Sequence, residues 1–233
     1  KTEKTVKEEY AYLIINVAAV LPPFLLSFDK KVAFFKQFYR LFPSLIITAF
    51  IFVAWDVFFT KYAVWGFNER YLTGIDIINL PIEEVLFFFT IPYACIFTYE
   101  VYKAYFPDYS FTFKNSNVIS IILSIVLFIL GILYLNNLYT SITFIATATF
   151  LVIPKLLGAA IFLRYLFPTY LIILVPFLIV NGLLTGSMMD EPIVWYNENE
   201  IIGVRFFTIP VEDSVYGFLL LYINLIFYEK VFR

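Results

Sequence analysis

Residues 81–102 read PIEEVLFFFTIPYACIFTYEVY, and this run indicates the class of fold. A helix that crosses a membrane needs about 20 mostly apolar residues. The run supplies them, with charges only at Glu83 and Glu84 near its start and Glu100 near its end. Proline suits the beginning of a helix. The run therefore predicts a membrane-spanning helix whose first turn carries two carboxyl groups.

Similar runs recur along all 233 residues. The chain is 62% hydrophobic and 15% charged, whereas soluble domains are about 45–50% apolar and about 25% charged. The sequence therefore predicts an all-α, polytopic transmembrane helical bundle of about seven spans. We expect these spans at about 10–28, 41–60, 82–102, 117–135, 140–160, 169–186 and 206–229.

An internal repeat relates the two halves of the chain. A shift of 129 residues places Pro81-Ile82-Glu83-Glu84 on Pro210-Val211-Glu212-Asp213, and Gly74 on Gly203. The copies lie four spans apart, so they have the same orientation in the membrane. We expect two parallel three-helix repeats, 1–110 and 137–233, joined by a connecting span in 111–136. Functional sites of such proteins tend to lie between the repeats.

The loop charges predict how the chain crosses the membrane. Cytoplasmic loops are enriched in lysine and arginine. Most of these residues lie in the loops on the side of the C-terminus. We therefore expect a multi-pass protein of the cell (inner) membrane, with its N-terminus outside and its C-terminus in the cytoplasm.

Several classes of site are excluded by residues that the chain lacks. It has no histidine and one cysteine, Cys95, so a Ser-His-Asp triad, a Cys-His pair and the usual zinc sites are excluded. Its eight glycines form no nucleotide-binding motif. The last span has no lysine before Lys230, which excludes a retinal Schiff base there. We expect no cofactor, metal or nucleic acid as a partner.

The doubled acids are the strongest candidates for chemistry. Carboxyl groups in a first turn also stabilise a helix through its dipole, so both motifs are compatible with helix starts alone. Acids at the edge of the hydrocarbon usually face a cavity or a partner, and their repetition favours this second interpretation. Adjacent residues project about 100° apart on a helix, so we expect one acid of each pair to face inward. The sequence leaves open which one.

Aromatic and polar residues beside these motifs have two interpretations. One is an aromatic belt at the membrane surface; the other is a cap on an apolar cavity, where ring faces stabilise a cation. Under the second interpretation the candidate substrate-binding residues are Trp55, Asp56, Trp65, Phe67, Asn68, Trp195, Tyr196 and Asn197. We expect Tyr99-Glu100 and Tyr228-Glu229 to be interfacial anchors.

Over about 10–229, the chain resembles the lycopene cyclase domain family in its fused two-domain form. The resemblance lies in Trp55-Asp56, Trp65-Gly-Phe-Asn68 and Pro81-Ile-Glu-Glu84, and in the second copy Trp195-Tyr-Asn197 and Pro210-Val-Glu-Asp213. It implies that Glu83, Glu84, Glu212 and Asp213 are catalytic. It also implies a redox-neutral isomerisation of lycopene, taken from the bilayer, to γ-carotene and β-carotene by proton-initiated ring closure. We expect the proton donor to be Glu83 or Glu212.

Two alternative functions stay open at this stage. A related carotenoid hydratase would trap a similar cation with water. A non-catalytic carotenoid-binding membrane subunit would use the acids only as helix starts. The sequence leaves the oligomeric state and the number of ends cyclised undetermined.

Overall fold

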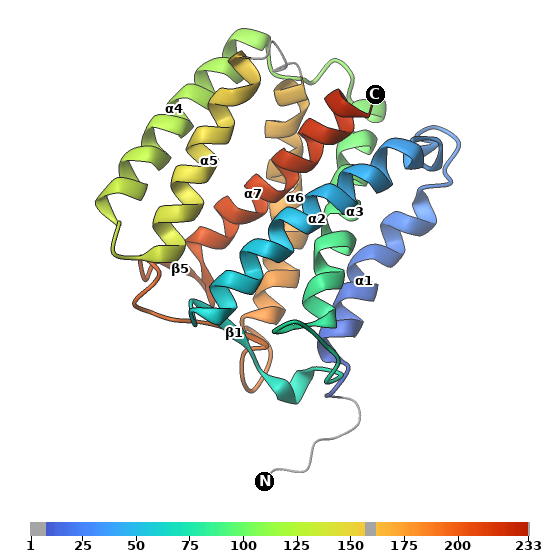
Figure 1. The fold of residues 1–233 in the computed structure, drawn as a ribbon. Coiled ribbons are helices and arrows are strands. Elements are labelled where there is room, and N and C mark those ends of the chain that lie inside the picture. Colours follow the sequence, from blue (N-terminus) through green and yellow to red (C-terminus); the bar gives the residue numbers. More distant parts are fainter. Residues whose placement is uncertain (1–7, 157–161, 233) are drawn as a thin grey trace.

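The computed structural model describes residues 8–156 and 162–232, and seven α-helices within them form one bundle (Figure 1). The helices are α1 (Ala11–Leu26), α2 (Phe38–Lys61), α3 (Ile82–Tyr105), α4 (Phe113–Leu133), α5 (Leu138–Leu156), α6 (Leu163–Leu184) and α7 (Val211–Ile226). A short helix η1 (Phe34–Gln37) precedes α2, and a π-helical turn η4 (Phe227–Val231) extends α7. The all-α fold class is confirmed.

Six short strands lie near the end of the bundle where α1 begins (Figure 1). Strand β1 (Trp65–Phe67) pairs antiparallel with β4 (Val194–Tyr196). Two hairpins, β2 (Asp76–Ile77) with β3 (Leu80–Pro81) and β5 (Arg205–Phe206) with β6 (Ile209–Pro210), lead directly into α3 and α7. A 3₁₀ turn, η2 (Glu69–Tyr71), follows β1.

Two expected helix starts differ from the structure. The seventh helix begins at Val211 and not at 206, because the apolar residues before it form the β5–β6 hairpin, in which Phe207 has a positive φ of 55°. The sixth begins at Leu163, earlier than 169. The Arg164 side chain donates to Phe111 O and Ser110 Oγ outside the helix, so its charge does not interrupt α6.

The two repeats meet through reciprocal contacts. Asn68 N donates to Ile193 O over 2.8 Å, and its counterpart Asn197 N donates to Val64 O over 2.9 Å. The two acceptor residues, Val64 and Ile193, are also 129 residues apart, as expected for two copies related by a two-fold axis. The two parallel three-helix repeats predicted from the sequence are therefore present.

The repeats also share a helical core. Helix α1 packs on α3 and α5 packs on α7, while α3 and α7 pack on α6 and α2 of the opposite repeat. Helix α4 packs chiefly on α5 at the edge of the bundle (Figure 1). The third helix of each repeat is therefore central, and residues that begin α3 and α7 lie close to the repeat interface.

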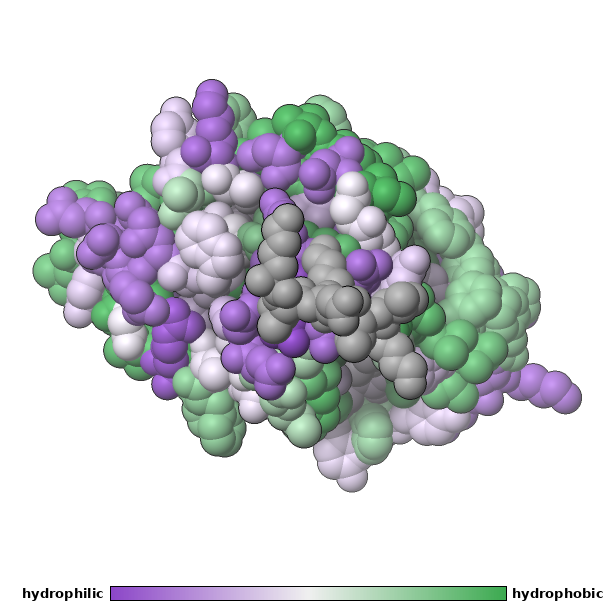
Figure 2. Space-filling view, turned by 90° about the horizontal axis from the view of Figure 1, so that it is seen from below, coloured by the Kyte–Doolittle hydropathy of each residue, from purple (hydrophilic) through white to green (hydrophobic). Residues whose placement is uncertain are grey.

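The outer surface suits a lipid environment. Within the part of the chain that the structure describes, five helical segments are long and apolar enough to cross a membrane: those of α2, α3, α4, α6 and α7. Apolar side chains are exposed along them, and Phe50 is 79% exposed. At the strand-bearing end, Figure 2 shows hydrophilic side chains gathered together and hydrophobic ones around much of the rim. The chain is thus a membrane protein.

The expectation that the two Tyr-Glu pairs are interfacial anchors is wrong. Tyr99 and Tyr228 are almost completely buried, and Glu229 is 8% exposed. Tyr99 Oη donates to Glu229 Oε1 over 2.9 Å, and Lys103 Nζ does so over 2.7 Å. Arg40 Nη2 donates to Tyr228 Oη over 3.2 Å. These contacts join α2 and α3 to η4 at the end of α7, so the pairs hold the repeats together.

We expect Glu229→Gln to lower the free energy of unfolding by about 2 kcal/mol, because Lys103 loses one of two partners in a largely buried ion pair. Thermal unfolding in detergent measures this loss. Glu198→Gln is the matched control, since Glu198 pairs with Arg205 at the same distance, 2.7 Å, but is 68% exposed. Exposed pairs contribute little, so equal effects of the two substitutions would contradict the structural role.

Candidate active site

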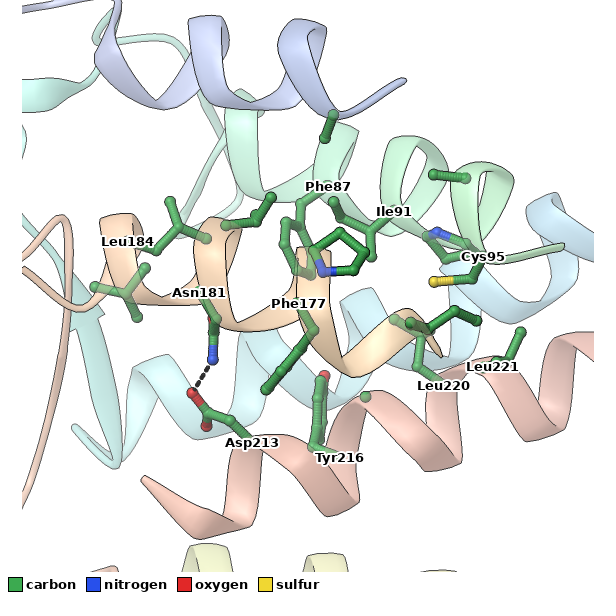
Figure 3. A pocket seen from close by; sticks show the side chains of 18 of the residues that line it. Phe87, Ile91, Cys95, Phe177, Asn181, Leu184, Asp213, Tyr216, Leu220 and Leu221 are labelled. Carbon is green, nitrogen blue, oxygen red and sulfur yellow. Dashed lines mark hydrogen bonds between the residues drawn. The ribbon is translucent and has the colours of Figure 1, made fainter. Parts of the chain in front are cut away.

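A cavity of about 170 Å³ lies between the two repeats. Its wall comes from α1, α3, α5, α6 and α7 and from strands β1 and β4, and it is mostly apolar. Figure 3 shows Phe87, Ile91, Phe177, Leu184 and Leu220 around it. An apolar cavity of about 150 Å³ holds one benzene molecule. This cavity therefore has room for one ring-sized hydrocarbon group.

Two carboxyl groups line the cavity, one from each repeat. Glu84 comes from the first turn of α3 and Asp213 from the first turn of α7. The two side chains interact electrostatically. Tyr12 Oη donates to Glu84 Oε2 over 2.5 Å, and it is the only donor to Glu84 among the described residues. Glu84 therefore has one of its oxygens free to face a bound molecule.

Asp213 has a different environment from Glu84. Tyr139 Oη donates to its Oδ1 over 2.7 Å, while Asn181 Nδ2 and Tyr196 Oη donate to its Oδ2 over 2.6 and 2.8 Å. Figure 3 shows the bond from Asn181 on α6. Burial and the Asp213 charge raise the pKa of Tyr196, in strand β4, well above its usual value, so Tyr196 stays a donor. Three donors stabilise a carboxylate.

Glu83 and Glu212 point elsewhere. Both are fully buried but neither lines the cavity. Glu83 Oε1 accepts from Thr73 N over 2.8 Å, and Glu212 Oε1 accepts from the equivalent Ile202 N over 2.7 Å. These bonds attach the loop before each hairpin to the start of α3 or α7. The expectation that Glu83 or Glu212 is the proton donor therefore does not fit their positions.

Asp56 is a further buried carboxyl, close to Glu84. It is 0% exposed, accepts a short hydrogen bond from Trp65 Nε1, and interacts electrostatically with Glu84. It does not line the cavity, but Trp65 does. Asp56 on α2 corresponds to Asn181 on α6 when Phe42-Pro43 is aligned with Phe167-Pro168. Asp56 is thus placed to orient the Trp65 ring.

The remaining candidate substrate-binding residues divide into two groups. Phe67 and Tyr196 line the cavity with Trp65. The others are Trp55, Asn68, Trp195 and Asn197, none of which lines it.

Those four residues support the cavity from outside. The Trp55 ring packs edge-on against Tyr216 at 5.6 Å. Asn68 Nδ2 donates to Glu191 Oε2, and Asn197 Nδ2 donates to Ala63 O, so both amides hold loops. Trp195 is 41% exposed and packs on Gly66, where a Cβ atom would collide with its ring.

Sequence reasoning missed four residues of the site: Tyr12, Tyr139, Asn181 and Tyr216. A signal for the first two exists in the repeat. Tyr12 precedes Glu84 by 72 residues, and Tyr139 precedes Asp213 by 74. A tyrosine near the start of the first helix of each repeat thus meets an acid at the start of the third. Asn181 and Tyr216 have no comparable signal in the repeat, because the equivalent residues of the first copy, Asp56 and Phe87, are of a different type.

The described ranges contain no group of three or more His, Cys, Asp or Glu side chains arranged to bind a metal ion. The two carboxyl groups of the cavity bond to tyrosine hydroxyls and, at Asp213, to an amide. The arrangement can therefore transfer a proton to or from an apolar molecule.

These features define a class of protein: a helical membrane protein in which two parallel repeats enclose an apolar cavity, with one carboxyl from each repeat. A family model described as lycopene cyclase matches residues 9–102 and again residues 136–231. The chain therefore belongs to the lycopene cyclase family, whose members are carotenoid cyclases. Each match covers one repeat and omits α4. Searches of the curated proteins and of the solved structures found no match.

Proposed function

We propose that this protein closes the acyclic ψ-ends of lycopene into β-rings by acid catalysis without net oxidation or reduction, giving γ-carotene and then β-carotene. The observation that carries the proposal is the pair Glu84 and Asp213, which face one apolar cavity from equivalent positions. The reaction needs an acid, a base and an apolar environment, and the cavity supplies two carboxyl groups within a mostly apolar wall. It makes the enzyme an intramolecular lyase, or isomerase.

Glu84 is the proposed proton donor. A protonated Glu84 gives its proton to the terminal double bond of the ψ-end, which leaves a tertiary carbocation. The neighbouring double bond attacks this cation and closes a six-membered ring, so the positive charge moves to a ring carbon. The single donor to Glu84 and its nearly complete burial support the choice, because burial favours the neutral carboxylic acid.

Asp213 is the proposed base. Its three hydrogen-bond donors support a carboxylate, which attracts the ring cation and then removes a proton from the carbon beside it. Removal of this proton forms the double bond of the β-ring. One proton enters and one leaves, so the product is an isomer of the substrate.

The aromatic wall supports a cationic intermediate. The rings of Trp65 and Tyr139 line the cavity close to the two carboxyl groups. Ring faces stabilise a nearby cation by about 2 kcal/mol or more where water is excluded. The mostly apolar wall also protects the cation from water, which favours ring closure over hydration.

The size of the cavity supports reaction at one end of lycopene at a time. About 170 Å³ holds one end group and not the whole chain. The rest of the hydrocarbon then lies outside the cavity, among the apolar surfaces that face the bilayer. Release and reinsertion would present the second end to the same carboxyl groups.

We also propose the placement of the chain in the cell. The loop charges support a multi-pass protein of the inner membrane, with the strand-bearing end and the N-terminus outside and the C-terminus cytoplasmic. The two repeats, 1–110 and 137–233, then each supply one carboxyl, and 111–136 joins them.

The test is expression in a lycopene-accumulating bacterium, with pigments separated by chromatography. We expect lycopene to be replaced by γ-carotene and β-carotene. Hydroxylated products would indicate a hydratase. Unchanged lycopene beside well-folded protein would contradict the proposal and favour a carotenoid-binding subunit.

The double substitution Glu83→Gln/Glu212→Gln tests whether the outer pair has a structural role. Glutamine keeps the oxygen that accepts from Thr73 N or Ile202 N, but it places an amide where Oε2 has no described partner. We expect product formation within a few-fold of the unmutated protein and a lower unfolding temperature, at a cost of about 1–3 kcal/mol per site. If the folded double variant formed no product, Glu83 or Glu212 would be needed for the reaction, and the structural role would be contradicted.

A further inference from the structure

The hydroxyl group of Tyr216 is buried without a hydrogen-bond partner among the described residues. Tyr216 lies on α7, one turn after Asp213, and lines the cavity. Figure 3 shows its side chain extending from α7 into the cavity. Buried polar groups are nearly always paired, so an unpaired hydroxyl in this place needs an explanation.

The Tyr216 hydroxyl lies within electrostatic range of three carboxyl groups. Tyr216 interacts electrostatically with Asp56, Glu84 and Asp213, yet is hydrogen-bonded to none of them. Its ring is held by edge-on contacts with Phe52 at 5.2 Å and Trp55 at 5.6 Å. The ring is thus fixed in the cavity wall that also holds the two proposed catalytic carboxyls.

The proposed reaction leaves both carboxyl groups in the wrong protonation state. After ring closure Glu84 has lost its proton and Asp213 has gained one. The two acids are on different helices, and each is bonded to other residues. The apolar wall limits supply from bulk solvent, so the next cycle requires transfer of the proton from Asp213 back to Glu84.

We propose that Tyr216 is the proton-relay residue that resets the site after each ring closure; this inference rests on the proposed function. Protonated Asp213 gives its proton to the Tyr216 oxygen through one bridging water while the Tyr216 hydroxyl proton passes to ionised Glu84. Asp213 becomes a carboxylate, Glu84 becomes a carboxylic acid, and Tyr216 is unchanged. The first repeat has Phe87 at the equivalent position, so the relay is present in one copy only.

The test is Tyr216→Phe, which removes only the unpaired hydroxyl. In lipid vesicles with enzyme in excess over lycopene, the first ring closure uses the proton already on Glu84. We expect its rate to stay within about two-fold of the unmutated protein. With lycopene in excess, we expect turnover to fall by about 100-fold, the lower end of the 10²–10⁴-fold range that positioned proton transfer contributes.

Tyr222→Phe is the matched control. Tyr222 is on the same helix, and its hydroxyl is also buried without a partner among the described residues. It packs against Phe162 and Phe218 and does not line the cavity. We expect it to leave both rates unchanged.

Each outcome decides the inference separately from the proposed function. Unchanged turnover in Tyr216→Phe overturns the relay, and so does an equal slowing of the first closure and of turnover, which would place the hydroxyl in ring closure itself. Equal effects of Tyr216→Phe and Tyr222→Phe overturn it as well. If the unmutated protein forms no ring under either condition, the proposed function fails first.

Discussion

Glu84→Gln is expected to abolish ring formation, with a rate at least about 1,000-fold below that of the unmutated protein. An amide has no proton to give to a double bond, and a positioned general acid contributes about 10²–10⁴-fold. The substitution keeps the size of the side chain and an oxygen that accepts from Tyr12 Oη. We therefore expect little change in folding. Purified protein in lipid vesicles with lycopene, sampled over time by chromatography, measures the loss.

The control for this substitution is Glu83→Gln. Glu83 is in the same turn of α3 and is also buried, but it faces Thr73 N and not the cavity. The pair of variants separates a catalytic carboxyl from a structural one at adjacent positions. Similar activities for the two folded variants would show that the inward direction of Glu84 does not identify the acid.

Asp213→Asn is expected to slow ring formation by about 100-fold and to change the product. Asparagine removes the negative charge that stabilises the ring cation and the oxygen that takes its proton, a change of about 10²–10³-fold for similar electrostatic groups. Cations that persist lose a proton from another adjacent carbon and give an isomeric ring. Chromatography of the pigments, with absorption spectra of each peak, detects both effects.

Asp213→Asn should also destabilise the fold moderately. Tyr139 donates to one oxygen of the present carboxylate, and Tyr196 and Asn181 donate to the other. The new amide places its NH₂ group opposite one of these two sets of donors, at a cost of about 1–3 kcal/mol. Asp76→Asn on the exposed strand β2 is the control, and we expect it to change neither rate nor stability. An unchanged rate and product pattern with Asp213→Asn would remove Asp213 from the reaction.

The local hydropathy pattern of the sequence was sufficient to predict most of the fold. Length and hydropathy located all seven helices within a few residues at most boundaries, because a membrane-spanning helix must satisfy its own backbone hydrogen bonds along about 20 apolar residues. The pattern failed at 206–210, where apolar residues form a hairpin and not helix. Hydropathy does not distinguish an apolar strand from an apolar helix end.

The amino-acid sequence by itself determined the repeat, the bundle and the location of two acidic pairs at the starts of two helices. Only the tertiary structure decided the direction of each acid. Loop amides of Thr73 and Ile202 bind Glu83 and Glu212, which leaves Glu84 and Asp213 to face the cavity. The partners that distinguish these two come from other helices and from strand β4, far away in sequence. Side-chain direction and environment depend on such long-range contacts, which local sequence does not encode.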